Sequence, residues 1–231
     1  MHPLISERAI LLEDTQELIV GELHFGLGEG INGTLVQQTI YKETMADLER
    51  MIKKYDVKKL VINGDLKDSI GIPTGFEIGM LKGLHRLLEE LSIEAVLVKG
   101  NHDGSIERYI SFGCVKSYKT RGASKNILVI HGDSILSDAN SCDVLVTAHL
   151  HPVVQLEKRR IFAWLFMTRT KGRPEEIIVM PPFNSFVGGA AIEVNRAPLL
   201  KKFYRGSRKW TTYVIGTDGL LYGDLESVSR G

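Results

Sequence analysis

Short apolar runs separated by polar turns open the chain. Residues 9–12 and 18–20 are two such runs, and the polar segment 13–16 between them is typical of a hairpin turn. Residues 35–55 and 75–92 instead carry apolar side chains at helical spacing, which predicts one helix in each segment. Thr34 stands where an N-cap of the first helix is expected.

Compact apolar runs between and after these helices predict buried strands, at residues 60–62, 95–98, 127–130 and 144–146. Strands and helices alternate over the first hundred residues, a pattern typical of a largely parallel sheet with helices packed on it. After residue 150 the helical periodicity stops. The runs there are expected to form a second sheet against the first: 153–154, 160–167, 177–180, 212–215 and 220–222.

Size and composition fit one globular domain over residues 1–231, with 43% hydrophobic and 25% charged residues. No apolar run approaches the roughly 18–20 residues that a membrane span needs. The first residues lack the basic cap and apolar stretch of a secretory signal. Cys114 and Cys142 lack CxxC spacing, so we expect two free thiols. Together these features predict a cytoplasmic protein without a membrane partner.

Residue types that bind metals directly follow five of the expected strands. Because the carboxyl ends of parallel strands lie along one edge of a sheet, these side chains are expected to converge in one cleft. Five of the seven histidines in the chain occupy such positions. The candidate site residues are Glu22, His24, Asp65, Asn101, His102, His131, His149 and His151.

The combination of imidazole and carboxylate ligands suits Mn, Fe, Co, Ni or Zn better than an all-oxygen cage, which would suit Mg or Ca. Side chains alternate along an extended segment, so His149 and His151 are expected on one side, as are Glu22 and His24. Taken alone, each motif has a simpler interpretation: His131 as a hydrogen-bonded histidine at a strand end, for example. Their occurrence together favours a metal site.

In chain order, these segments resemble the motifs of the calcineurin-like metallophosphoesterases: D-x-H, G-D-x-x-D, G-N-H-D/E, H and G-H-x-H. The corresponding segments here are 22–24, 64–68, 100–103, His131 and 148–151. The segment 180–184 resembles, less specifically, the small prokaryotic ICC-like branch, which includes proteins associated with DNA ligase and helicase partners. The resemblance implies a four-layer α/β/β/α sandwich with two mixed β-sheets.

The resemblance also implies two divalent transition-metal ions, with Mn expected first and Ni, Co, Fe or Zn as alternatives. Glu22, His24, Asp65 and His151 would hold the first ion. Asp65 would bridge to the second ion, whose other ligands would be Asn101, His131 and His149. His102 would face the substrate as a catalytic residue that protonates the leaving group, and Asp68 or Asp103 could orient a histidine.

The implied activity is hydrolysis of phosphomonoesters or phosphodiesters by water that the two metals activate. Glu22 departs from the family pattern, which usually has Asp at this position. From the sequence alone we expect Glu22→Asp to keep or raise metal affinity. Ala148 in place of the usual Gly is a second, smaller departure. Glu29, in the same glycine-rich loop as Glu22, is treated as a solvated carboxylate.

Two other functions remain open. One is a catalytically weak scaffold on the same fold. The other is a nuclease that acts with DNA-repair partners, because residues 152–231 hold 13 Lys and Arg against 7 Asp and Glu. A solvated rim is the simpler interpretation of these charges. The sequence leaves the substrate and oligomeric state open. The basic residues concerned are Lys158, Arg159, Arg160, Arg169, Lys171, Arg173, Arg196, Lys201, Lys202, Arg205, Arg208 and Lys209.

Overall fold

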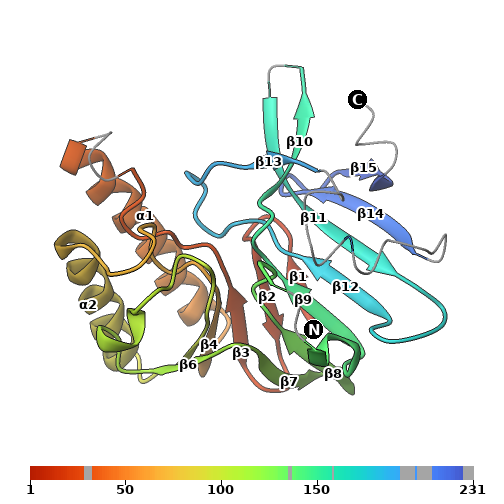
Figure 1. Ribbon diagram of the computed structural model, residues 1–231, viewed down its shortest axis with the longest axis horizontal. Coiled ribbons are helices and arrows are strands. Elements are labelled where there is room, and N and C mark those ends of the chain that lie inside the picture. Colours follow the sequence, from red (N-terminus) through yellow and green to blue (C-terminus); the bar gives the residue numbers. More distant parts are fainter. Residues whose placement is uncertain (29–32, 135–136, 158, 193–200, 202–209, 226–231) are drawn as a thin grey trace.

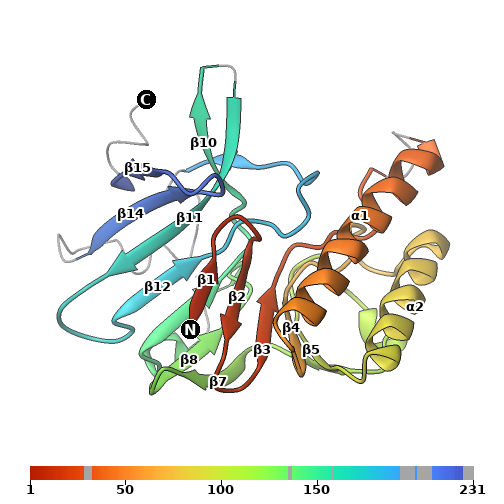
Figure 2. The same ribbon diagram turned by 180° about the vertical axis from the view of Figure 1, so that it is seen from behind.

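Two mixed β-sheets face each other, and two helices cover the outer face of the first sheet (Figures 1 and 2). The computed structural model describes residues 1–28, 33–134, 137–157, 159–192, 201 and 210–225. The α/β/β/α sandwich expected from the sequence is confirmed. Over the second sheet, the described residues of the outer layer include the short 3-10 helix η2 (Ser137–Asn140) and the segments around Trp210 and Leu225.

The first sheet begins with the expected hairpin of residues 9–12 and 17–20, extended by one further antiparallel strand at the N-terminus, and continues as a parallel sheet. Its β1 (His2–Leu4), β2 (Ala9–Leu12) and β3 (Glu17–Val20) are antiparallel, whereas β3, β4 (Lys59–Asn63), β5 (Glu94–Val98) and β6 (Gly113–Val115) run parallel. Side chains alternate between its faces: Leu18 and Val20 pack toward the helices, and Ile19 packs toward the second sheet. In spatial order the strands are β1, β2, β3, β4, β5 and β6.

Both helices form where the apolar periodicity predicts them. Helix α1 (Gly33–Lys54) begins slightly earlier than expected, and the side chain of Thr34, the expected N-cap, lies outside the described part of the structure. Helix α2 (Gly75–Glu90) is capped by Thr74, whose hydroxyl accepts the N–H of Glu77. The Glu77 carboxylate accepts the N–H of Thr74 at 2.8 Å and completes a capping box. No helix within the described residues combines the length and apolarity required to traverse a bilayer.

The second sheet contains the expected β-rich part of the chain. Its β9 (Val144–Thr147) runs parallel to both β8 (Lys125–Val129) and β12 (Glu176–Val179), and most other pairs are antiparallel. Its main path in spatial order is β13 (Ala190–Ala191), β10 (Pro152–Leu156), β11 (Arg159–Thr168), β12, β9, β8 and β7 (Tyr118–Gly122). Beside β11 lies β14 (Thr211–Gly216), followed by β15 (Leu221–Gly223).

A continuous apolar layer joins the sheets. Val61 of β4, Val129 of β8 and Val146 of β9 belong to this buried cluster, together with Trp164. Because the layer fixes one sheet over the other, the loops after β3, β4 and β5 lie near the loops after β8 and β9. Cys114 and Cys142 are free thiols, as expected. The remaining short helix, η1 (Ile106–Arg108), follows β5.

Candidate metal centre

The loops after β3 and β4 run side by side beyond the end of their strands. The N–H of Glu22 donates to the carbonyl of Gly64 at 3.0 Å, and the N–H of His24 donates to the carbonyl of Asp65 at 3.0 Å. Glu22, His24 and Asp65 all have positive φ, at 59°, 44° and 49°. The segment 22–24 is therefore not extended, and the alternation argument used for it from the sequence was wrong.

The loop after β9 has the same left-handed geometry. β9 ends at Thr147, and His149 and His151 have φ values of 64° and 42°. Residues 149–151 are therefore not extended, and the expectation based on strand alternation was wrong here too. Each left-handed non-glycine residue costs about 1 kcal/mol or more, and such strain concentrates at functional sites. Five of the eight candidate residues carry it.

Glu22 is the centre of the first group of side chains. Its carboxylate is fully buried, and its Oε2 lies 2.9 Å from His24 Nε2 and 2.7 Å from His151 Nε2. Its Oε1 accepts the backbone N–H of His149 at 2.6 Å, which ties the first sheet to the second. Glu22, His24 and His151 thus present ligand atoms that lie within 4.8 Å of one another.

A second group surrounds the Nε2 atom of His131. This atom lies 3.2 Å from His149 Nδ1, 3.3 Å from Asn101 Oδ1 and 3.4 Å from Asp65 Oδ2. Atoms bound to one cation at about 2.0–2.2 Å stand roughly 3.0–3.5 Å apart in tetrahedral or octahedral geometry, so these spacings fit a coordination shell. Asp65 Oδ2 also lies 4.0 Å from His24 Nε2, between the two groups.

Three imidazoles have their outer nitrogen engaged, which leaves Nε2 directed at the site. His24 Nδ1 lies 3.0 Å from Asp68 Oδ1, and His151 Nδ1 lies 2.8 Å from the Gly188 carbonyl. His131 Nδ1 lies 3.4 Å from the Asn63 carbonyl. Donation of Nδ1–H to these acceptors fixes the tautomer that a metal ligand requires. The expectation that Asp68 orients a histidine therefore has a specific partner, His24.

His102 lies beside the first group. Its N–H donates to Asp65 Oδ1 at 2.9 Å, and its ring Nδ1 contacts the carbonyl of Asp68. His24, Asp68 and His102 form a further group with ligand atoms within 4.8 Å. In that group, the Asp68 carboxylate already accepts a hydrogen bond from His24 Nδ1, and the Asp68 backbone carbonyl accepts one from His102 Nδ1. Nε2 is the His102 nitrogen left for a substrate.

Asp103 has a different role from the one considered in the sequence. It does not contact a histidine through its hydrogen bonds: its carboxylate accepts the N–H groups of Asp65, Leu66 and Gly100 at 2.8–3.0 Å. Burial raises its pKa to about 6, against the three donors, which favour the carboxylate. Asp103 therefore holds the loop after β4 against the loop after β5.

Two glycines make room for the site. A Cβ on Gly64, whose φ is +78°, would lie 1.9 Å from His131 Nδ1, and a Cβ on Gly100 would lie 2.1 Å from Asp65 Oδ1. Any other residue at either position would displace a candidate ligand. The glycines of the motifs around Asp65 and Asn101 thus allow two backbones to approach the side chains closely.

Sequence reasoning missed three residues that support the site. Asn184 Nδ2 donates to the Leu23 carbonyl at 2.9 Å and holds the loop of Glu22 and His24. The Gly188 carbonyl orients His151. Lys67, which looks like a surface charge in the sequence, is fully buried. The segment 180–184 offered a signal only through its loose family resemblance, and Gly188 and Lys67 offered none.

The buried carboxylates of Glu22 and Asp65 require positive charge nearby. Among the described residues, the ion pairs of Glu22 and Asp65 are with histidines. Burial disfavours the charged form of His24, but hydrogen bonds with Asp68 and Glu22 outweigh it and raise the pKa of His24 to about 10. Burial also opposes charge on His131, yet Asp65 and Glu22 raise its pKa to about 9. The protons on His24 and His131 supply positive charge that bound cations would otherwise supply, so the residues fit a metal centre.

We expect metal removal to make stability sensitive to alkaline pH. His24 and His131 titrate near 10 and 9 in the metal-free fold, against about 6.5 when unfolded. Their stabilisation is complete below the unfolded value and is lost as pH rises through the folded values. In EDTA, the free energy of urea unfolding should fall on the order of 3 kcal/mol between about pH 7 and pH 9. Mn²⁺-loaded protein should show little fall; equal falls in both samples would contradict this account.

The structure reverses the expectation for Glu22→Asp. The longer side chain reaches both the His149 N–H and the ring nitrogens of His24 and His151. Asp is shorter by one methylene and cannot keep all three contacts. We expect Glu22→Asp to weaken binding of the first cation about tenfold, the loss of one charge-assisted hydrogen bond, in a Mn²⁺ titration. Glu22→Gln keeps the length of the side chain but removes its charge, so it separates the two effects. Tighter Mn²⁺ binding by Glu22→Asp than by the unmodified protein would instead support the expectation from the sequence.

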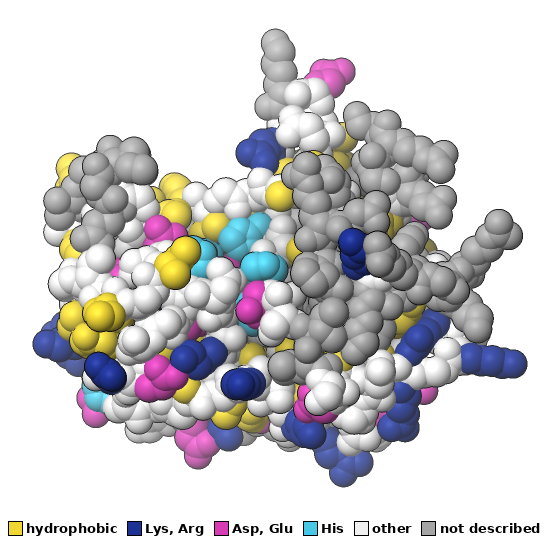
Figure 3. Space-filling model, in the orientation of Figure 1, with side chains coloured by type: hydrophobic (Ala, Val, Ile, Leu, Met, Phe, Trp, Pro, Cys, Tyr) yellow, Lys and Arg dark blue, Asp and Glu magenta, His cyan; other side chains and the backbone are white. Residues whose placement is uncertain are grey.

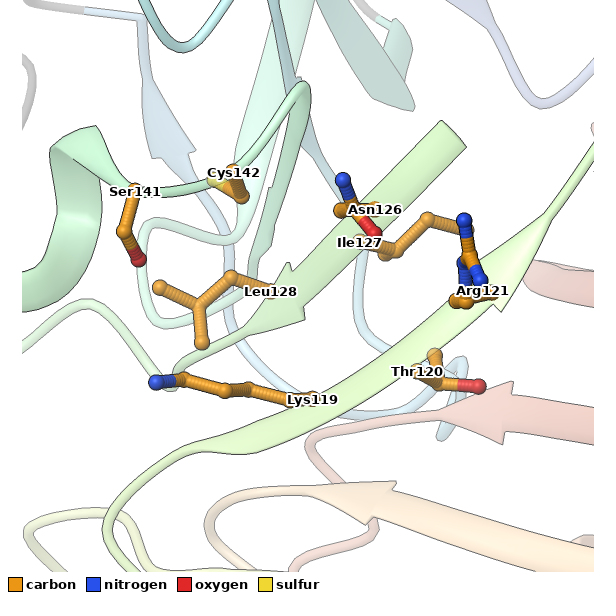
Figure 4. A pocket seen from close by; sticks show the side chains of 8 residues that line it. All are labelled: Lys119, Thr120, Arg121, Asn126, Ile127, Leu128, Ser141 and Cys142. Carbon is orange, nitrogen blue, oxygen red and sulfur yellow. The ribbon is translucent and has the colours of Figure 1, made fainter. Parts of the chain in front are cut away.

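The candidate site opens on one face of the molecule. Figure 3 shows histidine side chains gathered near the middle of this face, with acidic side chains beside them. A cavity of about 250 Å³ adjoins His131 and is lined also by Lys99, Lys116, Asp133 and Ser134. A larger hollow of about 370 Å³ lies between β7, β8 and residues 141–142 (Figure 4). No histidine or carboxylate lines that hollow, so it lacks the chemistry of the site.

The basic residues of the second part are only partly described. Lys158, Arg196, Lys202, Arg205, Arg208 and Lys209 lie outside the described residues, as does Glu29. Three others are engaged within the chain. Arg160 donates to the Gly189 carbonyl, Arg169 donates to the Pro174 carbonyl and stacks on Trp210, and Arg173 pairs with Asp143 at 3.0 Å. These contacts favour the simpler interpretation of a solvated rim for those three.

Comparisons with known proteins identify the family and support the fold. The family model of the calcineurin-like phosphoesterases matches residues 18–180, which include every candidate site residue. The structure resembles the nuclease MPE of Pseudomonas putida, with a TM-score of 0.62 and 18% identity over 94% of this chain and 92% of that chain. It aligns less closely with Yfce, a phosphoesterase from E. coli, at a TM-score of 0.43 and 16% identity over 90% and 97%. No curated protein sequence matched.

Proposed function

Because this chain belongs to the calcineurin-like phosphoesterase family, we propose that it hydrolyses phosphate esters with the help of two divalent cations. The observation that carries the proposal is the pair of ligand groups around Glu22 and His131, with Asp65 between them. Glu22, His24, Asp65 and His151 would hold one cation. Asp65, Asn101, His131 and His149 would hold the other.

Cations bound there would supply positive charge for the phosphoryl oxygens and lower the pKa of a bound water toward neutrality. The contribution of the chain is to hold that charge in a fixed place. Asp68, Asn63 and Gly188 keep three imidazoles in one tautomer. Asp103 keeps the loops that carry Asp65 and Asn101 together, so the ligand set is formed before substrate arrives.

His102 is the proposed general acid. Its Nδ1 is engaged by the Asp68 carbonyl, so its protonated Nε2 can donate to the leaving oxygen as the P–O bond breaks. The attacking water contributes its OH to phosphorus and releases its other proton. His102 is then reprotonated from solvent, to which its half-buried ring has access.

A nuclease is the second candidate. The observation that favours it is the cavity beside His131, into which Lys99 and Lys116 project from the loops after β5 and β6. Such a cavity could hold a phosphate next to the scissile one in a polynucleotide. Lys99 is partly neutralised by Glu107, and Asp133 lines the same space, so the positive charge there is modest. The described contacts do not favour a link with DNA-repair partners.

The proposal is tested by metal-dependent hydrolysis. Protein treated with EDTA is reloaded with Mn²⁺, Ni²⁺, Co²⁺, Zn²⁺ or Mg²⁺ and assayed on nitrophenyl mono- and diesters, cyclic nucleotides and single-stranded DNA. We expect activity to vanish in EDTA and to return with a transition metal, Mn²⁺ first. Hydrolysis that persists in EDTA, or none with any metal, would refute the proposal. Cleavage and low-salt binding of DNA would favour the nuclease.

A further inference from the structure

Lys67 is a buried lysine in the loop that carries Asp65 and Asp68. Its side chain is 0% exposed, although lysine is almost never fully buried without a partner. Its ammonium donates to the carbonyl of His102 at 2.5 Å and to the carbonyl of Ser69. Among the ion pairs of the described residues, none joins Lys67 to a carboxylate. Its shortest hydrogen bonds are therefore to two backbone oxygens, and a longer one of 3.5 Å reaches the hydroxyl of Ser69.

These two carbonyls belong to the two segments that define the position of the His102 ring. One is the carbonyl of His102 itself. The other belongs to Ser69, the residue directly after Asp68. The carbonyl of Asp68 accepts the hydrogen bond from the ring Nδ1 of His102. Two carbonyl oxygens that converge on one point repel each other unless a donor lies between them. The ammonium of Lys67 supplies that donor and holds the segments at the spacing that the ring contact needs.

The segment that Lys67 grips is itself rigid. Ser69 donates its N–H to Glu77 Oε1 at 2.7 Å and its hydroxyl to Glu77 Oε2 at 2.6 Å. Glu77 is buried and is part of the capping box of α2. The contact between Lys67 and Ser69 therefore anchors His102 to the start of α2. The three residues that make this connection are Lys67, Ser69 and Glu77, and none of them is a candidate metal ligand.

We propose that Lys67 is a positioning residue for His102. By joining the His102 carbonyl to the Ser69 carbonyl, it keeps the ring Nδ1 on the Asp68 carbonyl and directs Nε2 at the leaving oxygen. The inference rests on the proposed function, and it adds a residue that does not hold metal. Displacement of a general acid by about 1 Å costs on the order of a hundredfold in rate.

The test compares esters that need a general acid with esters that do not. Lys67→Met and Lys67→Gln are loaded with Mn²⁺ and assayed on phenyl and nitrophenyl esters, with Lys58→Met, an exposed lysine paired with Asp56, as control. We expect unchanged metal content, a loss of about 10- to 100-fold on the phenyl ester and less than about threefold on the nitrophenyl ester. In a His102→Ala background, Lys67→Met should cost nothing more on the phenyl ester.

Equal losses on both esters, or losses that multiply with those of His102→Ala, would show a merely structural role and overturn the proposal. So would full activity of both Lys67 variants. Lys67→Gln keeps a hydrogen-bond donor for one of the two carbonyls. If Lys67→Met does not fold, the phenyl and nitrophenyl esters are compared with Lys67→Gln instead. Failure of the proposed function is a separate outcome: the unmodified protein itself would then lack metal-dependent hydrolysis.

Discussion

Asp65→Asn is expected to lower the metal content to at most one ion per chain and to reduce turnover at least about 1000-fold. Asp65 Oδ2 lies 3.4 Å from His131 Nε2 and 4.0 Å from His24 Nε2, so its carboxylate is the proposed bridge between the two ligand sets. An amide has the same shape but no charge, and it cannot offer each cation a negative oxygen. Its Oδ1 can still accept the N–H of His102, so the loop should keep its structure.

Two measurements test this prediction. They are metal analysis after gel filtration and the steady-state rate of hydrolysis of a nitrophenyl diester. Asp47→Asn, which changes an exposed carboxylate on α1, is the matched control and should retain full metal and activity. If Asp65→Asn kept two ions per chain, Asp65 would not bridge, and the assignment of the two ligand sets would need to change.

His102→Ala is expected to retain metal and to lose about 100- to 10,000-fold in turnover on esters with poor leaving groups. On nitrophenyl esters, whose leaving group needs little protonation, the loss should be less than about tenfold. The physical reason is that, in the proposed mechanism, the His102 ring protonates the leaving oxygen, whereas its backbone N–H donates to Asp65 and is kept by the Ala variant.

A plot of log rate against leaving-group acidity, made with one metal at saturating substrate, displays this difference as a steeper slope for the variant. His85→Ala serves as the matched histidine control, because His85 lies on α2 and bonds to Ser111. An unchanged slope in His102→Ala would remove the general-acid role. A loss of bound metal would instead make His102 a ligand, in the group that it forms with His24 and Asp68.

The positions of the candidate residues could be predicted because they follow strands. Apolar runs such as 60–62 and 144–146 mark buried strands through local composition alone, and Asp65 and His149 come shortly after them. The sheet pairing that brings these ends together is long-range. The alternation of strands and helices predicted the parallel sheet, and the family resemblance added the sandwich of two mixed sheets. The structure places Glu22 of the first sheet 2.6 Å from a backbone N–H of the second, at His149.

Local backbone geometry could not be predicted. Left-handed φ at Glu22 and His149 has no sequence signal, because the strain is offset by contacts from distant segments. The burial of Lys67 and the actual role of Asp103 could not be predicted for a related reason: each side chain satisfies backbone groups of another loop.

The central claim is that donor atoms from both sheets surround two adjacent cations. Electron paramagnetic resonance of protein refilled with Mn²⁺, combined with metal analysis, tests it most directly. We expect about two Mn²⁺ per chain and the multiline spectrum of exchange-coupled ions roughly 3.5–4 Å apart. A spectrum of isolated Mn²⁺, with one ion or fewer per chain, would contradict the account.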